Sequence, residues 1–328
     1  MKPAPSSRKG RAVLALALAC VCWGLGFPLM KALTARAGVL APGMDSWFVS
    51  GATIALRFSI GAVVLSVLKP IRPTKSELVQ GLWLGVSTGI GMVLQADGLA
   101  YTAASTSAFL TQGYVLLLPT VTALLTRRWP APRIVACAGL AVLGLAILSG
   151  FDPATLSLGR GEAETLGAAL CFTIQILLLS HQGFAENRTA PVTNVMFFAM
   201  AAMAAPVALV HLRGPADVVA VVGTAPSLIV FALMLLLSTL FSFVLMNRFQ
   251  REVTASEAGI IYGLEPVFAS LFALGLPAWL SPRLGIAYDN EVLTTELLLG
   301  GGLVVAATLG LSLLDRGERQ AAESSATA

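Results

Sequence analysis

Two ionisable side chains stand in the middle of long apolar stretches of the sequence, Arg57 within residues 47–68 and Glu265 within residues 256–280. If such a stretch crosses a membrane, a charged side chain at its centre costs about 2.5–3.5 kcal/mol on insertion scales and must face a cavity or a partner. An arginine does not lose its proton to escape burial, so Arg57 needs an anion. Candidates are Glu265, Asp97 or an acidic group of a solute. The pattern predicts a solute site, a structural ion pair or, for Arg57, contact with the membrane interface.

The neighbours of Glu265 can shape such a site. Tyr262 lies three residues earlier and therefore projects from the same helical face. Pro266 cannot donate a hydrogen bond to the carbonyl of residue 262, so it predicts a kink that leaves an acceptor free at membrane depth. The functional interpretation is a substrate or proton site. The structural alternative is a neutral, hydrogen-bonded glutamic acid that locks two helices together.

Uncharged polar and aromatic residues in other apolar stretches are suited to orienting a solute by hydrogen bonds. They are Gln95, Gln112, Tyr114, Gln175 and Trp23. Each has a structural alternative, either a bond to a neighbouring helix worth about 0.6 kcal/mol or, for Trp23, a place in the apolar core. Asp97 and Asn247 lie near the ends of their stretches. They predict two gates or two solvated helix caps.

The composition excludes a soluble globular protein. Of the 328 residues, 56% are hydrophobic and 12% are charged, against about a quarter charged in an ordinary soluble domain. The mean hydropathy is +0.83. Ten stretches are long enough for a membrane crossing, which takes about 20 residues. They cover residues 12–30, 47–68, 78–99, 103–126, 133–150, 165–185, 191–212, 226–246, 256–280 and 295–314. We therefore expect an all-α membrane protein with ten transmembrane helices.

Basic residues in the connections set the expected orientation. With the N-terminus in the cytoplasm, 15 Lys and Arg residues fall in cytoplasmic segments and five in external ones, as the positive-inside rule requires. We expect a multi-pass protein of the cell membrane, such as a bacterial inner membrane, with both termini in the cytoplasm and a polar tail at 317–328. Because the basic residues are scattered, nucleic acid is not an expected partner.

The two halves of the chain show a weak internal repeat. Shifted by 150 residues, 99–108 aligns with 249–258. In both places one span ends, a turn of small residues follows, and the next span reaches a glycine, Gly113 or Gly263. Asp97 and Asn247 correspond under this shift, as do Gln112 and Tyr262.

An odd number of spans in each repeat inverts the second copy relative to the first. Inverted repeats recur in secondary transporters, because two nearly equivalent conformations can open to opposite sides. We expect one five-helix repeat over residues 1–150 and a second over 151–316, with an insertion at 278–291 in the second.

Short motifs in both halves carry a family resemblance. They are Cys22-Trp23-Gly24, Ala55-Leu56-Arg57-Phe58, Gly98-Leu99-Ala100-Tyr101-Thr102, Thr254-Ala255-Ser256-Glu257-Ala258 and Leu264-Glu265-Pro266-Val267-Phe268-Ala269. In this order and spacing, the chain resembles the EamA-type branch of the drug/metabolite transporter superfamily. The resemblance implies two EamA-like repeats in which spans 1 to 4 and 6 to 9 surround a central pathway, and it implies export. The Glu that members often carry after spans 4 and 9 is missing from this chain.

The sequence predicts a secondary transporter that moves a small organic metabolite by alternating access. One acid and one base near each other suit a zwitterion, so an amino acid or related amphipathic solute is the first expected substrate. The predicted substrate site comprises Arg57, Gln112, Tyr114, Tyr262, Glu265, Gln175 and Trp23, and the predicted gating or coupling residues are Asp97, Asn247 and Pro266. A multidrug or organic-cation efflux carrier is the alternative.

A membrane-embedded lipid-modifying enzyme is a weaker alternative. The chain has two histidines and no aspartate pair at metal-ligand spacing, so it offers neither an acid–base pair nor a metal centre. We expect no enzymatic activity, no cofactor and no metal. The expected partners are a small-molecule substrate and the lipid bilayer. Protons and a second copy of the chain are left open as further partners.

Overall fold

The computed structural model describes residues 6–70, 72–98, 101, 104–151 and 159–327. The helices of this part of the chain are α1 (Ser6–Leu40), α2 (Ser46–Leu68), α3 (Lys75–Gly98), α4 (Ala104–Thr111), α5 (Tyr114–Thr126), α6 (Pro132–Leu148), α7 (Arg160–Leu179), η1 (Gln182–Phe184), α8 (Thr189–His211), α9 (Pro215–Val222), α10 (Ala225–Leu233), η2 (Met234–Phe241), α11 (Ser242–Phe249), η3 (Gln250–Glu252), α12 (Ala255–Tyr262), α13 (Leu264–Ala273), α14 (Leu276–Leu284) and α15 (Thr295–Thr327). No strand occurs among these residues. The resembling motif at 98–102 lies largely outside the described residues.

The helices confirm a multi-pass membrane protein. Within the described residues, seven are long and apolar enough to cross a membrane, and an eighth span is formed if the bent pair 255–273 and 276–284 counts as one. The shorter apolar helices α6 and 295–311 stand where the fifth and tenth spans are predicted. The number of ten crossings therefore stays a prediction.

Two of the spans are interrupted at a glycine. Gly113 separates α4 from α5, and Gly263 separates α12 from α13. At each break the glycine N–H donates to the carbonyl three residues earlier, at 3.0 Å and 3.2 Å respectively, which tightens the helix locally. These are the two glycines that the 150-residue shift aligns, so both halves interrupt the corresponding span at the same point.

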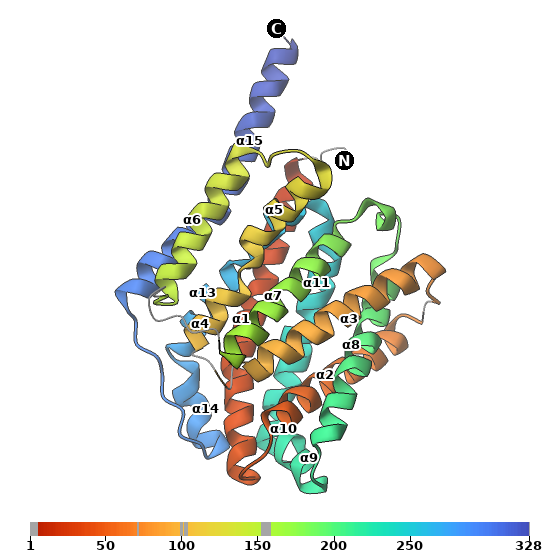
Figure 1. Cartoon of the computed structure of the whole chain (residues 1–328), viewed down its shortest axis with the longest axis vertical. Coiled ribbons are helices and arrows are strands. Elements are labelled where there is room, and N and C mark those ends of the chain that lie inside the picture. The colour runs from red at the N-terminus through yellow and green to blue at the C-terminus, as the bar shows by residue number, and fades with distance from the viewer. Residues whose placement is uncertain (1–5, 71, 99–100, 102–103, 152–158, 328) are drawn as a thin grey trace.

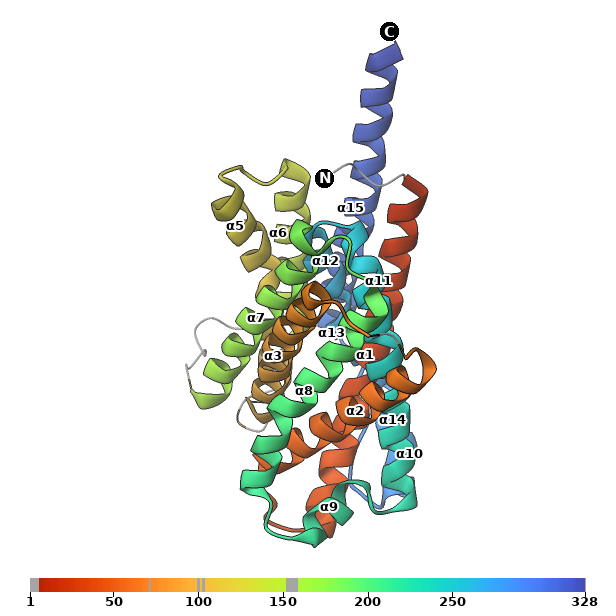
Figure 2. The ribbon, with the colours of Figure 1, turned by 90° about the vertical axis from the view of Figure 1, so that its right-hand side faces the viewer.

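Helices of the two halves pack against one another instead of forming separate domains (Figures 1 and 2). From the first half, α2 lies on α8, α3 lies on both α7 and α8, and α6 lies on α15. Glycines permit the close approach of α3 and α8: a Cβ at Gly85 would lie 2.5 Å from the carbonyl oxygen of Met196. Such small-residue contacts are typical of helix pairs in membranes. There the hydrophobic effect does not drive helix association, and van der Waals packing between the helices does.

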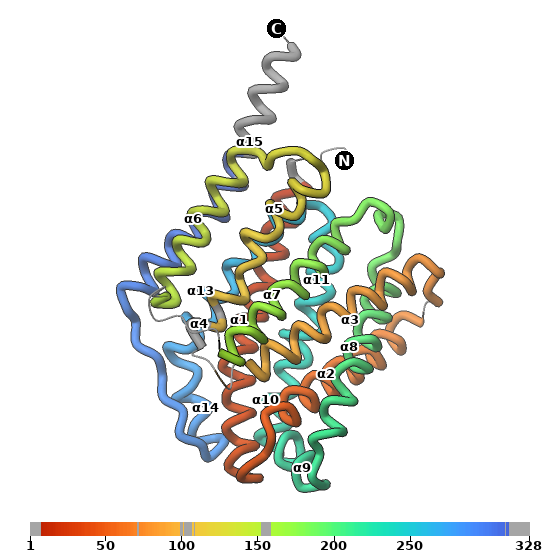
Figure 3. The backbone as a smooth tube through the Cα atoms, viewed as in Figure 1, coloured from red at the N-terminus to blue at the C-terminus, as the bar shows by residue number. Residues whose placement is uncertain are grey.

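The start of α1 and the end of α15 lie at the same end of the molecule (Figure 1), and from there both helices run into the bundle (Figure 3). The segment 317–327, predicted as a polar tail, continues the α15 helix and extends beyond the bundle. At the opposite end lie α9 and α14. There Arg213 donates hydrogen bonds to Asp217, which hold the pKa of the Asp217 carboxyl below its ordinary value.

The insertion at 278–291 is partly helical. It begins inside α14, which bends by 60° from the preceding span. Leu280 and Leu284 are fully buried in an apolar cluster with residues of α1, α9 and α10. The Lys31 ammonium group lies 5.3 Å from the centre of the Tyr288 ring. These contacts fix the insertion against α1.

Candidate solute site

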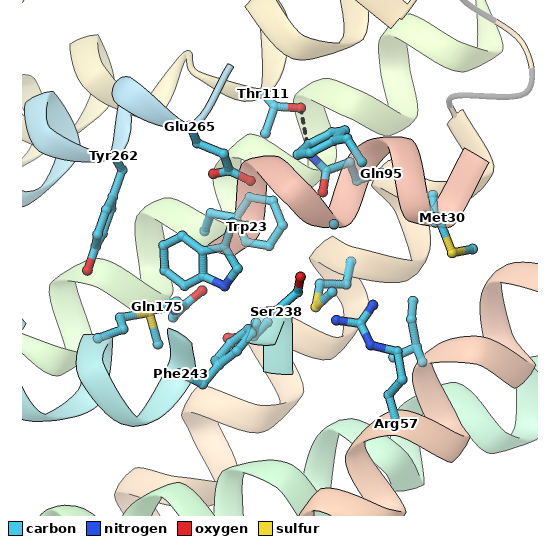
Figure 4. Close-up of a pocket in the computed structure, with 18 of the residues that line it drawn as sticks. Trp23, Met30, Arg57, Gln95, Thr111, Gln175, Ser238, Phe243, Tyr262 and Glu265 are labelled. Atoms are coloured by element: carbon cyan, nitrogen blue, oxygen red, sulfur yellow. Dashed lines mark hydrogen bonds between the residues drawn. The ribbon is translucent and has the colours of Figure 1, made fainter. Parts of the chain in front are cut away.

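A cavity of about 180 Å³ lies between the two halves. A single water needs about 10–15 Å³ by the same kind of measure, so this space suits a small organic solute. Its lining residues come from α1, α2, α3, α4, α5, α7, η2, α11, α12 and α13 (Figure 4). They are Trp23, Gly26, Phe27, Met30, Ile54, Arg57, Thr88, Met92, Gln95, Ala96, Thr111, Tyr114, Phe172, Gln175, Ile176, Met234, Ser238, Phe243, Met246, Tyr262 and Glu265. Most of these side chains are apolar.

Glu265 enters the cavity from the first turn of α13. Pro266 follows in the same turn, where a missing backbone N–H costs no helical hydrogen bond. Gly24 of α1 lets the two helices touch, since a Cβ there would lie 3.0 Å from the backbone oxygen of Glu265. No hydrogen bond or ion pair to the Glu265 carboxylate occurs within the described residues. The structural alternative, a glutamic acid that locks two helices, is therefore not supported.

Arg57 enters from α2 and is only 6% exposed. Its Nε donates to the Thr239 hydroxyl at 2.9 Å, which fixes the guanidinium. The terminal nitrogens have no hydrogen-bond or ion-pair partner within the part of the chain that the structure describes. One interpretation from the sequence is a structural ion pair between Arg57 and Glu265. It is wrong, because these two side chains form no ion pair in the structure. A place at the membrane interface is also excluded by the burial.

The aromatic side chains pack edge to face beside Glu265. The Trp23 ring lies 5.4 Å from that of Tyr262 and 5.6 Å from that of Phe243. The Trp23 indole nitrogen and the Thr88 hydroxyl are buried and have no hydrogen-bond partner among the described residues. Because buried polar groups are normally paired, these two groups in the cavity wall are available to a solute or to water.

Two other predicted residues are already engaged. The Tyr262 hydroxyl donates to Gln250 Oε1 at 2.8 Å, so its ring faces the cavity while its polar end is held elsewhere. The Gln175 amide donates to the Met246 sulfur at 3.0 Å. Tyr114 also lines the cavity.

Comparison with known proteins identifies the fold and family. Residues 10–150 match the EamA-like transporter family. The first half of the chain is therefore similar to EamA-like transporters. A transporter of Archaeoglobus fulgidus, described as uncharacterized, is 28% identical over 304 residues, which cover 92% of this chain and 85% of the relative. The family resemblance is thus confirmed over residues 10–150, and both comparisons support a membrane transporter of the drug/metabolite transporter type.

A solved crystal structure shares the fold of this EamA-like chain. It has a TM-score of 0.64 and 16% sequence identity, and the match covers 93% of this chain and 98% of the other. At that identity the likeness concerns the fold alone.

One residue predicted for the site of the EamA-like protein lies apart from the cavity. Gln112 is 4% exposed and does not line it, and its side-chain oxygen has no hydrogen-bond partner among the described residues. It adjoins Gly113, where α4 gives way to α5. Thr111 and Tyr114, which are three residues apart and share a helical face, line the cavity instead.

The predicted gating residues are also outside the cavity, in hydrogen-bonded contacts between helices. Asp97, at the end of α3, accepts from Ser46 at 2.7 Å and from Arg160 at 2.6 Å. Asn247 donates to Thr193 at 3.0 Å. Both Asp97 and Asn247 are completely buried, so the alternative of solvated helix caps is wrong. Their role in gating stays a prediction.

Several cavity residues were not selected from the sequence as site residues. They include four methionines, Met30, Met92, Met234 and Met246, and the polar residues Thr88, Thr111 and Ser238. Gln95 donates to Thr111 at 3.1 Å. Methionine adapts its shape to irregular surfaces. In the sequence, only a polar residue inside an apolar stretch could have indicated such a cavity residue. This pattern identified Gln95, which also lines the cavity.

Asp97→Asn is expected to lower the free energy of unfolding by about 1–2 kcal/mol, because the uncharged amide loses the charge-assisted bond to Arg160, which is 44% exposed. Glu164→Gln removes the second, more local contact of the same arginine and is expected to cost less than about 0.5 kcal/mol. Denaturant unfolding of the detergent-solubilised variants measures both values. Equal losses in the two variants would show that the Asp97 contact does not hold α3 to α7.

Proposed function

We propose that the chain is a secondary transporter that carries a small organic, amphipathic metabolite across the membrane by alternating access. The observation that supports it is a mostly apolar cavity between the two halves, into which Glu265 and Arg57 project. Among the described residues, the Glu265 carboxylate and the terminal nitrogens of Arg57 have no hydrogen-bond or ion-pair partner. Unpaired charges at membrane depth are costly and usually functional. A bound solute with complementary groups would compensate both.

Contacts at the two ends of the bundle support alternating access. At the end of α3 near Asp97, Arg160 joins α3 to α7. At the other end of α3, Glu77 binds Arg188 at 2.7 Å. Each contact joins the first half of the chain to the second. We propose that opening to either side loosens one end at a time, with Asp97, Asn247 and Pro266 as gating or coupling residues.

The proposal includes the arrangement in the membrane. Two inverted repeats, over residues 1–150 and 151–316, would form the carrier. It would lie in the cell membrane, such as a bacterial inner membrane, with both termini in the cytoplasm. Export is the proposed direction. Protons are the proposed coupling ion, because Glu265 can take up a proton in the cavity. The two breaks at Gly113 and Gly263 support the repeat relation.

Efflux of organic cations is a second candidate with one observation in its favour. The Glu265 carboxylate stands beside the rings of Trp23 and Tyr262 (Figure 4), and aromatic faces with a carboxylate are suited to a quaternary or primary ammonium group. The cationic Arg57 in the same cavity weakens this candidate, since it repels a solute that carries positive charge alone.

Purified protein in sealed vesicles tests the proposed function. A thermal-shift screen against amino acids, nucleosides, sugars and organic cations selects ligands, and uptake of each is then measured against protein-free vesicles. We expect protein-dependent uptake of at least one amphipathic solute. Binding or uptake restricted to organic cations would favour the second candidate. No uptake across the whole panel would contradict the carrier proposal.

A further inference from the structure

We infer that the cavity selects dipolar solutes whose cationic and anionic groups are separated by an apolar spacer, in preference to α-amino acids. The inference rests on the proposed carrier function and narrows its substrate class. It follows from the positions of the two charged residues and from the side chains between them.

The acid and the base stand at different ends of the cavity. Glu265 comes from α13 and Arg57 from α2, and Figure 4 shows the Trp23 indole and Ser238 between them. No nitrogen of Arg57 lies within 4.0 Å of a carboxylate oxygen in the described residues. The two charges therefore do not neutralise each other in the structure. Each needs its own counter-charge.

The Arg57 end is built to receive an anionic group. The bond from Nε to Thr239, itself completely buried, fixes the plane of the guanidinium. The two terminal nitrogens stay unpartnered in the part of the chain that the structure describes. A guanidinium with free terminal N–H groups matches the geometry of a carboxylate or phosphate, and a buried one binds it more strongly than an exposed one.

The Glu265 end is suited to an ammonium group. The carboxylate has no donor within the described residues, and the Tyr262 hydroxyl, at the end of its ring remote from Glu265, donates to Gln250 at 2.8 Å. Trp23 presents its aromatic ring to the carboxylate, the Tyr262 ring packs against Trp23, and the nearby Gln95 amide is engaged with Thr111. The aromatic surface attracts a cation and offers no competing positive charge.

The walls along the rest of the cavity are apolar. Phe27, Ile54, Met92, Phe172 and Met234 contribute to them. An apolar segment of a solute would be stabilised there by burial. In an α-amino acid the ammonium and carboxylate groups share one carbon atom, so the molecule can satisfy one end of the cavity and leaves the other charge buried and unpaired.

Constitutional isomers test the inference because they differ only in the separation of the two charges. The pairs are ε-aminocaproate with norleucine, and ω-aminocaprylate with α-aminocaprylate. Dissociation constants are measured by isothermal titration of the full-length protein, and uptake is measured in vesicles. We expect the ω isomer of at least one pair to bind about tenfold or more tightly than its α isomer, since it forms one additional charge-assisted contact.

Variants show whether both ends contribute. Arg57→Gln and Glu265→Gln are each expected to reduce the advantage of the ω isomer to less than about twofold. Glu257→Gln is the control, because Glu257 is a buried carboxylate of the same span that lies outside the cavity. The advantage should persist in this control. Hexylamine and hexanoate, which carry one charge each, should bind more weakly than ε-aminocaproate.

The outcomes separate the inference from the proposed function. Equal or tighter binding of the α isomers overturns the inference, and their uptake would leave the carrier proposal intact. The inference also fails if neither isomer of either pair binds while other solutes are transported, or if the preference survives in both cavity variants. Absence of uptake for the isomers and for the whole screening panel contradicts the carrier proposal itself.

Discussion

Glu265→Gln is expected to reduce solute flux about 10- to 100-fold while leaving the melting temperature unchanged or higher. The loss corresponds to about 1.5–3 kcal/mol, the contribution of a hydrogen bond to a charged group. The fold should not suffer, because the carboxylate has no protein partner within the described residues and an uncharged amide is less costly at membrane depth. Uptake in vesicles and thermal unfolding of the same preparation measure the two effects.

Glu257→Gln provides the matched control for this prediction. Glu257 lies two turns earlier, binds Lys9 at 2.7 Å and completes a capping box with Thr254. The amide can still accept the Thr254 hydrogen bond, but the ion pair is lost. We expect a lower melting temperature with flux per folded molecule close to that of the native protein. If Glu265→Gln lowered the melting temperature and kept full flux, Glu265 would be a structural residue.

Gly85→Ala is expected to destabilise the protein, because Gly85 lies at the close contact between α3 and α8. The new Cβ would lie 2.5 Å from the backbone oxygen of Met196 and against the Cβ of Ala199. Neither is the end of a flexible side chain, so the two helices must separate. Overpacking of this kind costs about 1–3 kcal/mol and occasionally more. Thermal unfolding in detergent measures the loss.

Gly302→Ala makes the same chemical change in open space. A Cβ at Gly302 in α15 has no atom within 4 Å, so the variant should match the native melting temperature or exceed it slightly, as helix propensity favours alanine. A fall in melting temperature of the same size in both variants would mean that the effect comes from the helices themselves and not from the contact between α3 and α8.

The sequence predicts the helical elements well, because membrane depth imposes long apolar stretches that are easy to recognise. The 150-residue shift aligns Gly113 with Gly263, but the sequence does not predict that a helix breaks at either glycine. It misses the bend into α14, which depends on the burial of Leu280 against α1. The insertion has no hydrophobic period strong enough to reveal that contact.

The candidate site was harder to predict, because the rotation of each helix is set by its neighbours. A charged residue must avoid lipid, so Arg57 and Glu265 are found in the cavity. Gln112 and Met92 illustrate the limit. Gln112 lies outside the cavity although the neighbouring Thr111 lines it, and nothing in the stretch around Met92 distinguishes that methionine. The partner of Asp97, Arg160, belongs to the other half of the chain, and local sequence carries no sign of such a pair.

Solute counterflow in reconstituted vesicles tests the central claim most directly. Vesicles preloaded with an unlabelled solute from the screen are diluted into a trace of the labelled compound. A carrier that exposes one cavity alternately to the two sides predicts a transient accumulation of label above its outside concentration, diminished in Glu265→Gln and absent from protein-free vesicles. Label that equilibrates without such an overshoot, or an overshoot unaffected by the loss of the Glu265 charge, would contradict the account.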